Sequence, residues 1–211
     1  MELQRNKVFI QIGTNDGSDE FNSVVRQYDP SLVILVEPNK LLNDRINSNY
    51  YGINNFHIEN LAITEINKGV VDLVMPKDMP GSNRSVNGIH YEDKGYSLLP
   101  MNDWGDDFVT IQAESMTFND LCDKYGINDI HYLQIDTEGY DYEIIKAIDF
   151  SKINIDIIKY ENWGFDINCF TRHGEKYTEY GINGLNMVTE LLISLGYELQ
   201  NLYDDTIAIK K

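Results

Sequence analysis

Residues 8–17 read VFIQIGTNDG, and residues 32–37 read LVILVE. The first apolar run ends in a turn that carries Gly13 and Gly17, and the second ends at Glu37. A glycine lets the chain turn sharply and lets its backbone approach a ligand, and an acid about 20 residues further on can hold ribose hydroxyls. The two stretches therefore predict an α/β sheet that binds a nucleoside, with Glu37 on the ribose.

The charge of the turn indicates which nucleoside it accepts. A dinucleotide-binding turn carries a third glycine, so that a pyrophosphate can rest at the N-terminus of the first helix. This turn has two glycines and three nearby carboxylates, on Asp16, Asp19 and Glu20. Their charge repels a pyrophosphate and tolerates a cation. S-adenosylmethionine (SAM) carries a ribose, a sulfonium and an ammonium but no phosphate, so it fits this turn.

A second pattern lies in the middle of the chain, where residues 117–122 read TFNDLC and residues 132–143 read YLQIDTEGYDYE. With the glycine turn and the strand end at residues 37–39, this pattern resembles the FkbM-type family of SAM-dependent methyltransferases. The family signature is a short helix, an apolar strand and Lys-Ile-Asp-x-Glu-Gly before an acidic helix. The resemblance covers roughly residues 7–159.

Two positions depart from the family. Gln11 stands where these enzymes often have an acid, and Gln134 stands where the signature usually has Lys. The first departure removes the carboxylate that commonly contacts the methionine ammonium.

The resemblance implies a Rossmann-like class I methyltransferase fold of the α/β class. This fold has a mostly parallel seven-stranded sheet, helices on both faces and a C-terminal antiparallel hairpin. Hydrophobic periodicity places strands at 7–12, 32–36, 55–59, 130–135 and 155–160, helices at 18–27, 40–47 and 185–195, and the hairpin at 197–202 and 206–209. We expect one domain over residues 1–211.

The composition of the chain limits which classes of partner and which cellular compartment we expect. The chain of 211 residues is 42% apolar and has a formal charge of −17, which argues against a nucleic-acid substrate. It contains no apolar run of membrane-spanning length and begins without signal-peptide features, so we expect a cytoplasmic protein with no membrane insertion. The isolated Cys122 and Cys169 suggest free thiols.

Residues 77–107 are too long for an ordinary connection and contain prolines and aromatic residues. We interpret them as an insertion that forms a lid on the substrate side. The alternative is a structural excursion, for example a contact in a homodimer. Residues 163–180 are a second candidate wall of the substrate pocket.

In an open parallel sheet, ligands bind beyond the carboxyl ends of the strands, where the turn at 13–17, Glu37, Asp136 and Glu161 should converge. Residues 60–62 resemble the family segment that lines the adenine. The predicted cofactor residues are Gln11, Gly13, Asn15, Asp16, Gly17, Glu37, Pro38, Asn60, Ala62 and Asp136. Glu37 could instead cap a helix, and Asn15 and Asp16 could serve only the turn.

Methyl transfer to a hydroxyl requires a positioned acceptor and removal of a proton. The candidates for this catalytic work are Asp136, Glu138, Glu161 and His173, with His90 as a further base. Alternatively, Asp136 with Glu161 and Asn162 is similar to the magnesium site of catechol O-methyltransferases, which would imply Mg²⁺ or Mn²⁺. Glu161 could also orient the substrate and Asp136 could be a structural hub. We expect structural roles for His57 and His131.

The family suggests that the acceptor is a sugar hydroxyl, in a glycan or a glycosylated metabolite, and a polyketide-type hydroxyl is the alternative. Aromatic rings pack on sugars while amides and guanidinium groups reach hydroxyls. The predicted substrate residues are Asn83, Arg84, Ser85, Trp163 and Arg172. The chain could be one module of a larger glycan-modifying polypeptide. Two rival functions remain, a non-catalytic nucleoside-binding module and a nicotinamide-dependent oxidoreductase.

Overall fold

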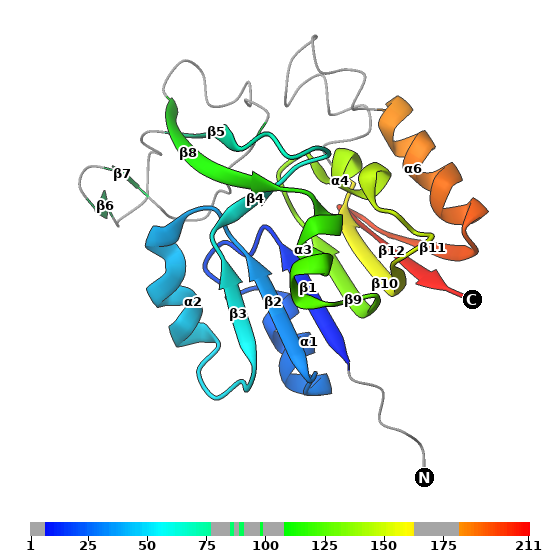
Figure 1. Cartoon of the computed structure of the whole chain (residues 1–211), viewed down its shortest axis with the longest axis horizontal. Helices are drawn as coiled ribbons and strands as arrows, with labels where there is room; N and C mark the ends of the chain where they lie inside the picture. The colour runs from blue at the N-terminus through cyan, green and yellow to red at the C-terminus, as the bar shows by residue number, and fades with distance from the viewer. Residues whose placement is uncertain (1–6, 77–84, 87–88, 91–97, 99–107, 163–181) are drawn as a thin grey trace.

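The computed structural model describes residues 7–76, 85–86, 89–90, 98, 108–162 and 182–211. Its main sheet has seven strands in the order β11-β12-β10-β9-β1-β2-β3, and β12 runs in the opposite direction to the other six (Figure 1). The strands are β1 (Val8–Ile12), β2 (Leu32–Val36), β3 (Phe56–Glu59), β9 (Asp129–Ile135), β10 (Asn154–Glu161), β11 (Tyr197–Leu202) and β12 (Asp205–Lys210). The predicted fold class is confirmed.

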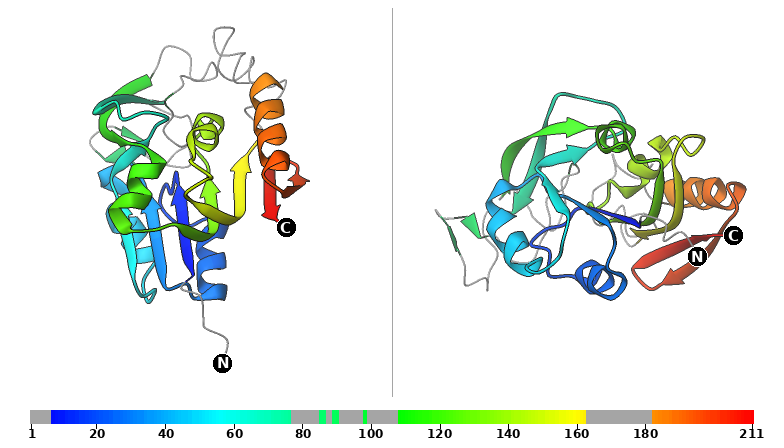
Figure 2. Two further views of the ribbon diagram at one scale, coloured as in Figure 1. Left: turned by 45° about the vertical axis from the view of Figure 1, so that its right-hand side comes forward. Right: turned by 60° about the horizontal axis from the view of Figure 1, so that its bottom comes forward.

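Helices cover both faces of this sheet (Figure 2). They are α1 (Glu20–Tyr28), the 3-10 helix η1 (Lys40–Leu42), α2 (Asn43–Asn49), α3 (Phe118–Tyr125), α4 (Asp141–Ala147) and α6 (Ile182–Ser194). Successive side chains of a strand point to opposite faces. Ile10 accordingly packs in the core with α3, α4 and α6, whereas Phe9 packs in a separate core with α1 and α2.

The predicted strands agree with the structure to within one residue at each end. The helices differ more. The predicted helix at 18–27 begins at Glu20, because the side chain of Asp19 caps it by accepting a hydrogen bond from the Phe21 amide (3.1 Å). The predicted helix at 40–47 is divided into η1 and α2, since Asn39 caps a short first turn.

A second, three-stranded sheet is absent from our sequence prediction. It has the order β4-β8-β5 and consists of β4 (Leu61–Ile63), β5 (Val70–Pro76) and β8 (Phe108–Met116). Two short strands, β6 (Ser85–Val86) and β7 (Ile89–His90), pair with each other. The rest of the predicted lid at 77–107, apart from residue 98, lies outside the described residues. The lid and the single-domain assignment stay predictions.

Two simpler expectations concern thiols and membranes. Cys122 is a free, buried thiol, and Cys169 lies outside the described residues. None of the described helices combines the length and the apolar character needed to span a membrane.

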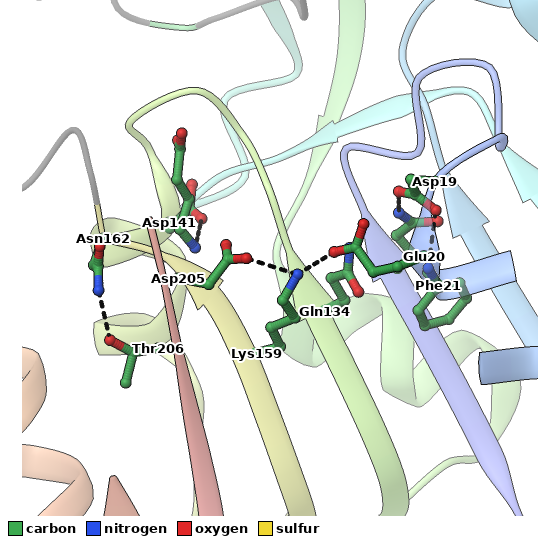
Figure 3. A network of polar contacts seen from close by, with 11 residues as sticks. Asp19, Glu20, Phe21, Gln134, Asp141, Lys159, Asn162, Asp205 and Thr206 are labelled. Carbon is green, nitrogen blue, oxygen red and sulfur yellow. Dashed lines mark hydrogen bonds and ion pairs between the residues drawn. The ribbon is translucent and has the colours of Figure 1, made fainter. Parts of the chain in front are cut away.

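A row of buried polar side chains crosses the sheet on the face that α1 covers. Gln11, Gln134 and Lys159 are register partners on β1, β9 and β10, and each is at most 8% exposed. The ammonium of Lys159 forms ion pairs with Glu20 in the first turn of α1 and with Asp205 at the start of β12 (2.8 Å), as Figure 3 shows. Lys159 therefore connects the helix that follows the glycine turn to the C-terminal hairpin.

We expect Lys159→Met to lower the free energy of unfolding by about 2 kcal/mol, because it removes charged hydrogen bonds and leaves Asp205 without its cation. Urea unfolding monitored by circular dichroism measures the change. The control is Lys152→Met, which removes an exposed pair with Asp149 and should leave the free energy of unfolding nearly unchanged. Equal losses in the two variants would contradict a special role for Lys159.

Candidate cofactor and active site

A cavity opens at the carboxyl ends of β1, β2 and β9. It contains about 620 Å³ of space not filled by protein atoms, part of it open to solvent. Its lining joins segments that are far apart in the sequence: Ile12, Gly13, Asn15, Val36, Glu37, Pro38, Leu61, Ala62, Ile63, Leu73, Leu98, Asp136, Thr137, Glu138 and Tyr140. We call it the main cavity. Its position is the one that the strand order of an open α/β sheet predicts for a ligand.

Glu37 is the most buried of the three acids in the described lining of the main cavity. It is 3% exposed, and its carboxylate accepts hydrogen bonds from the backbone amides of Asn15 (2.8 Å) and Asn39 (2.9 Å). Burial raises the pKa of Glu37 to about 7, and the two amide donors only partly oppose this shift. Because these donors hold the carboxylate at the edge of the cavity, it is positioned to accept from the hydroxyls of a ribose.

The glycine turn packs tightly on the neighbouring strand. Gly13 has a φ of +83°, and a Cβ atom added to it would lie 1.7 Å from the carbonyl oxygen of Asp136. No other residue fits there without displacing the end of β9. Gly17, with a φ of +75°, is instead packed on the ring of Tyr50, which a Cβ would approach to 2.9 Å. Gly13 therefore shapes the cavity, whereas Gly17 shapes the turn.

One wall of the main cavity is apolar. Leu61, Ala62 and Ile63 of β4 line it together with Leu73 of β5. Tyr140, which is buried, completes this part of the lining, and its hydroxyl is held by Glu65 and by the ammonium of Lys68 (3.2 Å). An apolar slot beside a ribose-binding acid suits an adenine ring.

A group of acids lies at the end of β9. The side chain of Asp136 has accessible surface, but many protein atoms surround it. The resulting desolvation raises the pKa of Asp136 well above its ordinary value, and the charges of Glu161 and Asp141 raise it further. Asp141 is fully buried, and burial raises its pKa to about 6. It accepts from the amides of Thr137 (3.0 Å) and Glu161 (3.1 Å), so it holds the ends of β9 and β10 together.

A second, polar recess adjoins the main cavity and shares Gly13, Asn15 and Asp136 with it. Its other lining residues are Thr14, Asp16, Ser18, Asp19 and Arg45. We call it the polar recess.

Two of the three acids of the turn are paired with cations in the structure, whereas the third, Asp19, has a neutral partner. Asp16 pairs with Arg45, Asp19 accepts from the amide of Gln11, and Glu20 pairs with Lys159. The recess therefore contains both signs of charge.

Residues 11–199 of the chain match the model of the FkbM methyltransferase domain. The chain belongs to that family. It is therefore a SAM-dependent methyltransferase, and the nicotinamide-dependent oxidoreductase considered above is excluded. A comparison with curated protein sequences gave no match.

Several solved structures are similar to this chain over most of its length. SMU.1697c from Streptococcus mutans, determined with S-adenosylhomocysteine (SAH), is 11% identical with a TM-score of 0.50, over 98% of this chain and 89% of that one. The O-methyltransferase from Bacillus cereus, also determined with SAH, is 11% identical with a TM-score of 0.49, over 97% and 74% of the two chains. Precorrin-6y C5,15-methyltransferase from Geobacter metallireducens is 12% identical with a TM-score of 0.47, over 100% and 83%.

The residues present in the methyltransferase fit SAM. Glu37 can hold the ribose, the apolar wall of Leu61 and Ala62 can hold the adenine, and the polar recess has room and charge for the amino-acid part. Pro38 lines the main cavity beside Glu37, in line with its predicted role. These assignments stay predictions about a cofactor that the fold places at this edge of the sheet.

Three predicted cofactor residues lie apart from both cavities. Gln11 is fully buried in the sheet, and Gly17 is packed on Tyr50. Asn60 donates from its amide to the backbone carbonyl of Glu37 (2.9 Å) and so braces the strand end. Gln11 and Asn60 each contact a lining residue, Asp19 of the polar recess and Glu37 of the main cavity, respectively.

The metal site gains no support. Within the described part of the chain, no three His, Cys, Asp or Glu side chains are grouped so as to hold a metal ion. Asn162, the third predicted ligand, donates its amide to the hydroxyl of Thr206 (2.9 Å), as Figure 3 shows. The charge of Glu161 raises the pKa of Asp136, and the backbone amide of Glu161 donates a hydrogen bond to the carboxylate of Asp141.

Other predicted site residues cannot be placed in the cavity. Asn83, Arg84, Trp163, Arg172 and His173 lie outside the described residues, and only the backbone of Ser85 and His90 is described. His131 lies in β9 with its Nε2 atom 3.9 Å from Asp156, and the ring of His57 contacts that of Tyr125. Neither of these two histidines lines the main cavity or the polar recess.

Because the pKa of Glu37 is raised, the free energy of unfolding should depend on pH. Between the ordinary value of 4.5 and about 7, the folded enzyme holds a proton on Glu37 that the unfolded chain releases. Ionised Glu37 therefore destabilises the folded state above pH 7, and this cost disappears below pH 4.5. Glu37→Gln is neutral throughout, so its stability relative to wild type should rise by about 3 kcal/mol from pH 4.5 to pH 8.

Urea unfolding at both pH values measures this difference, and calorimetry with SAH should show at least about tenfold weaker binding by the same variant. Glu198→Gln on β11, at an exposed acid, is the control and should change stability by no more than about 0.5 kcal/mol at either pH. If the difference in stability between Glu37→Gln and wild type did not vary with pH, the raised pKa of Glu37 would be contradicted.

Proposed function

We propose that this enzyme methylates a hydroxyl oxygen of a sugar, in a glycan or a glycosylated metabolite, and that it does so in the cytoplasm. The observation that carries the proposal is Asp136, a carboxylate that lines both the main cavity and the polar recess and whose pKa is raised. A hydroxyl is a weak acid, so its methylation needs a base at the reacting oxygen. Asp136 is the described acid best placed for that role.

When bound, SAM would supply a methyl group on a positively charged sulfur. The acceptor oxygen would form a bond to the methyl carbon while the carbon–sulfur bond breaks and SAH leaves. Asp136 accepts the proton of the acceptor hydroxyl in this proposal. Its raised pKa makes it a stronger base than an ordinary aspartate, and a positive charge bound nearby favours its ionised form. Glu138, which also lines the cavity, and Glu161 keep the local potential negative. Asp141 positions Asp136 and Glu161 by tying the two strand ends together.

The nature of the acceptor is supported by charge and by the family resemblance. The described lining of the main cavity contains three acids and no Lys or Arg, which disfavours a phosphate or a nucleic acid as the acceptor. A neutral polyhydroxylated molecule avoids this repulsion. The proposed contacts with Arg84, Trp163 and the other substrate residues, the homodimer and the larger polypeptide remain predictions.

We expect Asp136→Asn to lower the rate of methyl transfer at least about 100-fold, because the amide cannot accept the proton. SAH affinity should stay within about twofold of wild type, since the variant keeps the shape of the side chain. Labelled SAM and a panel of acceptors that contains neutral glycans, amines, carboxylates and nucleic acids measure the rate, and calorimetry measures binding. Asp44→Asn, at an exposed acid in the first turn of α2, is the control.

A wild-type rate in Asp136→Asn would remove Asp136 as the base. Methylation of only amines, carboxylates or nucleic acids in the panel would overturn the sugar proposal. A rate that falls with a chelator and returns with Mg²⁺ would favour the metal alternative. Binding of SAH without transfer to any acceptor would favour a non-catalytic module.

A further inference from the structure

The polar recess is the part of the site where the described lining carries both charges. Arg45 is its one cation among the described residues, and Asp16, Asp19 and Asp136 are its acids. The main cavity has no Lys or Arg in its described lining. The amino-acid part of SAM and SAH carries a carboxylate and an ammonium, which need partners of opposite sign when they leave water.

We propose that Arg45 binds the carboxylate, and Asp19 the ammonium, of the amino-acid part of the cofactor. The proposal rests on the SAM dependence of the enzyme. It assigns these contacts to Arg45 of α2 and to Asp19, the N-cap residue of α1, neither of which is among the cofactor residues predicted from the sequence. It also explains how the site works with Gln11 in the place of an acid.

Arg45 is placed to serve a second partner. It projects from α2 and pairs with the carboxylate of Asp16, yet its side chain remains 36% exposed. The carboxylate of Asp16 also accepts from the amide (3.0 Å) and the hydroxyl (2.6 Å) of Ser18, so Asp16 is held in place without Arg45. A guanidinium has five donors in a planar fork, and Asp16 uses only some of them. The remaining donors can bind a ligand carboxylate in the recess.

Asp19 supplies the negative charge that Gln11 lacks. The amide nitrogen of Gln11 donates to one oxygen of Asp19, and the other oxygen caps α1 through the Phe21 amide. Burial raises the pKa of Asp19, with the Gln11 hydrogen bond acting in the opposite direction. An ammonium bound at Asp19 would stabilise its ionised form. Gln11 is therefore a positioning residue that holds the carboxylate at the edge of the recess.

One hydroxyl beside the polar recess is unsatisfied within the described part of the chain. The hydroxyl of Thr14 is buried, with the residue 1% exposed, and it has no hydrogen-bond partner among the described residues. Thr14 lines the polar recess. A buried hydroxyl without a partner costs free energy, so the turn beside the recess is not fully satisfied by the described residues.

Three ligands separate the two charges. SAH carries both, decarboxylated SAH keeps only the ammonium, and 5′-methylthioadenosine has neither. Calorimetry at pH 8 should show that Arg45→Met weakens SAH about tenfold and leaves the other two ligands within about twofold. Asp19→Asn should weaken SAH and decarboxylated SAH about tenfold and leave 5′-methylthioadenosine unchanged, because Asn retains the helix cap.

The matched controls test for a general effect of charge and for folding. Lys40→Met removes a cation from the adjoining η1 and should leave all three affinities within about twofold. Arg45→Lys keeps the charge and should recover part of the SAH affinity that Arg45→Met loses. Circular dichroism of each variant confirms that it is folded.

The outcomes that overturn the proposal differ from those that overturn the function. Equal weakening of all three ligands by Arg45→Met would show that Arg45 only supports the turn. Unchanged SAH affinity in Arg45→Met or in Asp19→Asn would remove that residue from the site. If the wild-type enzyme binds none of the three ligands, the cofactor assignment itself is wrong, and the proposal fails with it.

Discussion

The burial of the Glu37 carboxylate is the constraint on which the cofactor site depends. A buried acid is costly unless donors surround it, and here the donors are backbone amides of Asn15 and Asn39. Asn15 can donate because the turn adopts a left-handed conformation, with a φ of 50°. That turn closes only because Gly13 lies against the carbonyl of Asp136. One electrostatic requirement therefore links the ends of β1, β2 and β9.

The site is built from polar groups that compensate one another over long sequence distances. The lysine that the family signature has in β9 is replaced by Gln134, and Lys159 occupies the register partner on the next strand. It forms ion pairs with Glu20 and Asp205, so the start of α1 is tied to the hairpin. Gln11 likewise reaches Asp19 instead of providing an acid itself. The two departures from the family thus have partners that only the fold reveals.

Local patterns predicted the main sheet well. Apolar runs such as residues 32–36 are short, regular and bounded by turn residues, and their period is visible in any window. The second sheet was missed because β4 and β5 both pair with β8, and their partner residues lie 32 to 53 positions further along the chain. Such pairing leaves no local signal. The walls that this sheet adds to the cavity, including Leu73, were missed for the same reason.

The sequence by itself determined the fold class and the positions of Glu37 and Asp136 directly after two strands, because apolar runs of strand length end at these residues. Only the tertiary structure decided how the acids of the turn are compensated. Arg45 reaches Asp16 from a separate helix, and Asp141 connects β9 to the amide of Glu161. The charge of an isolated acid can be read from its residue type, but its pKa and its availability depend on burial and on partners that folding brings together.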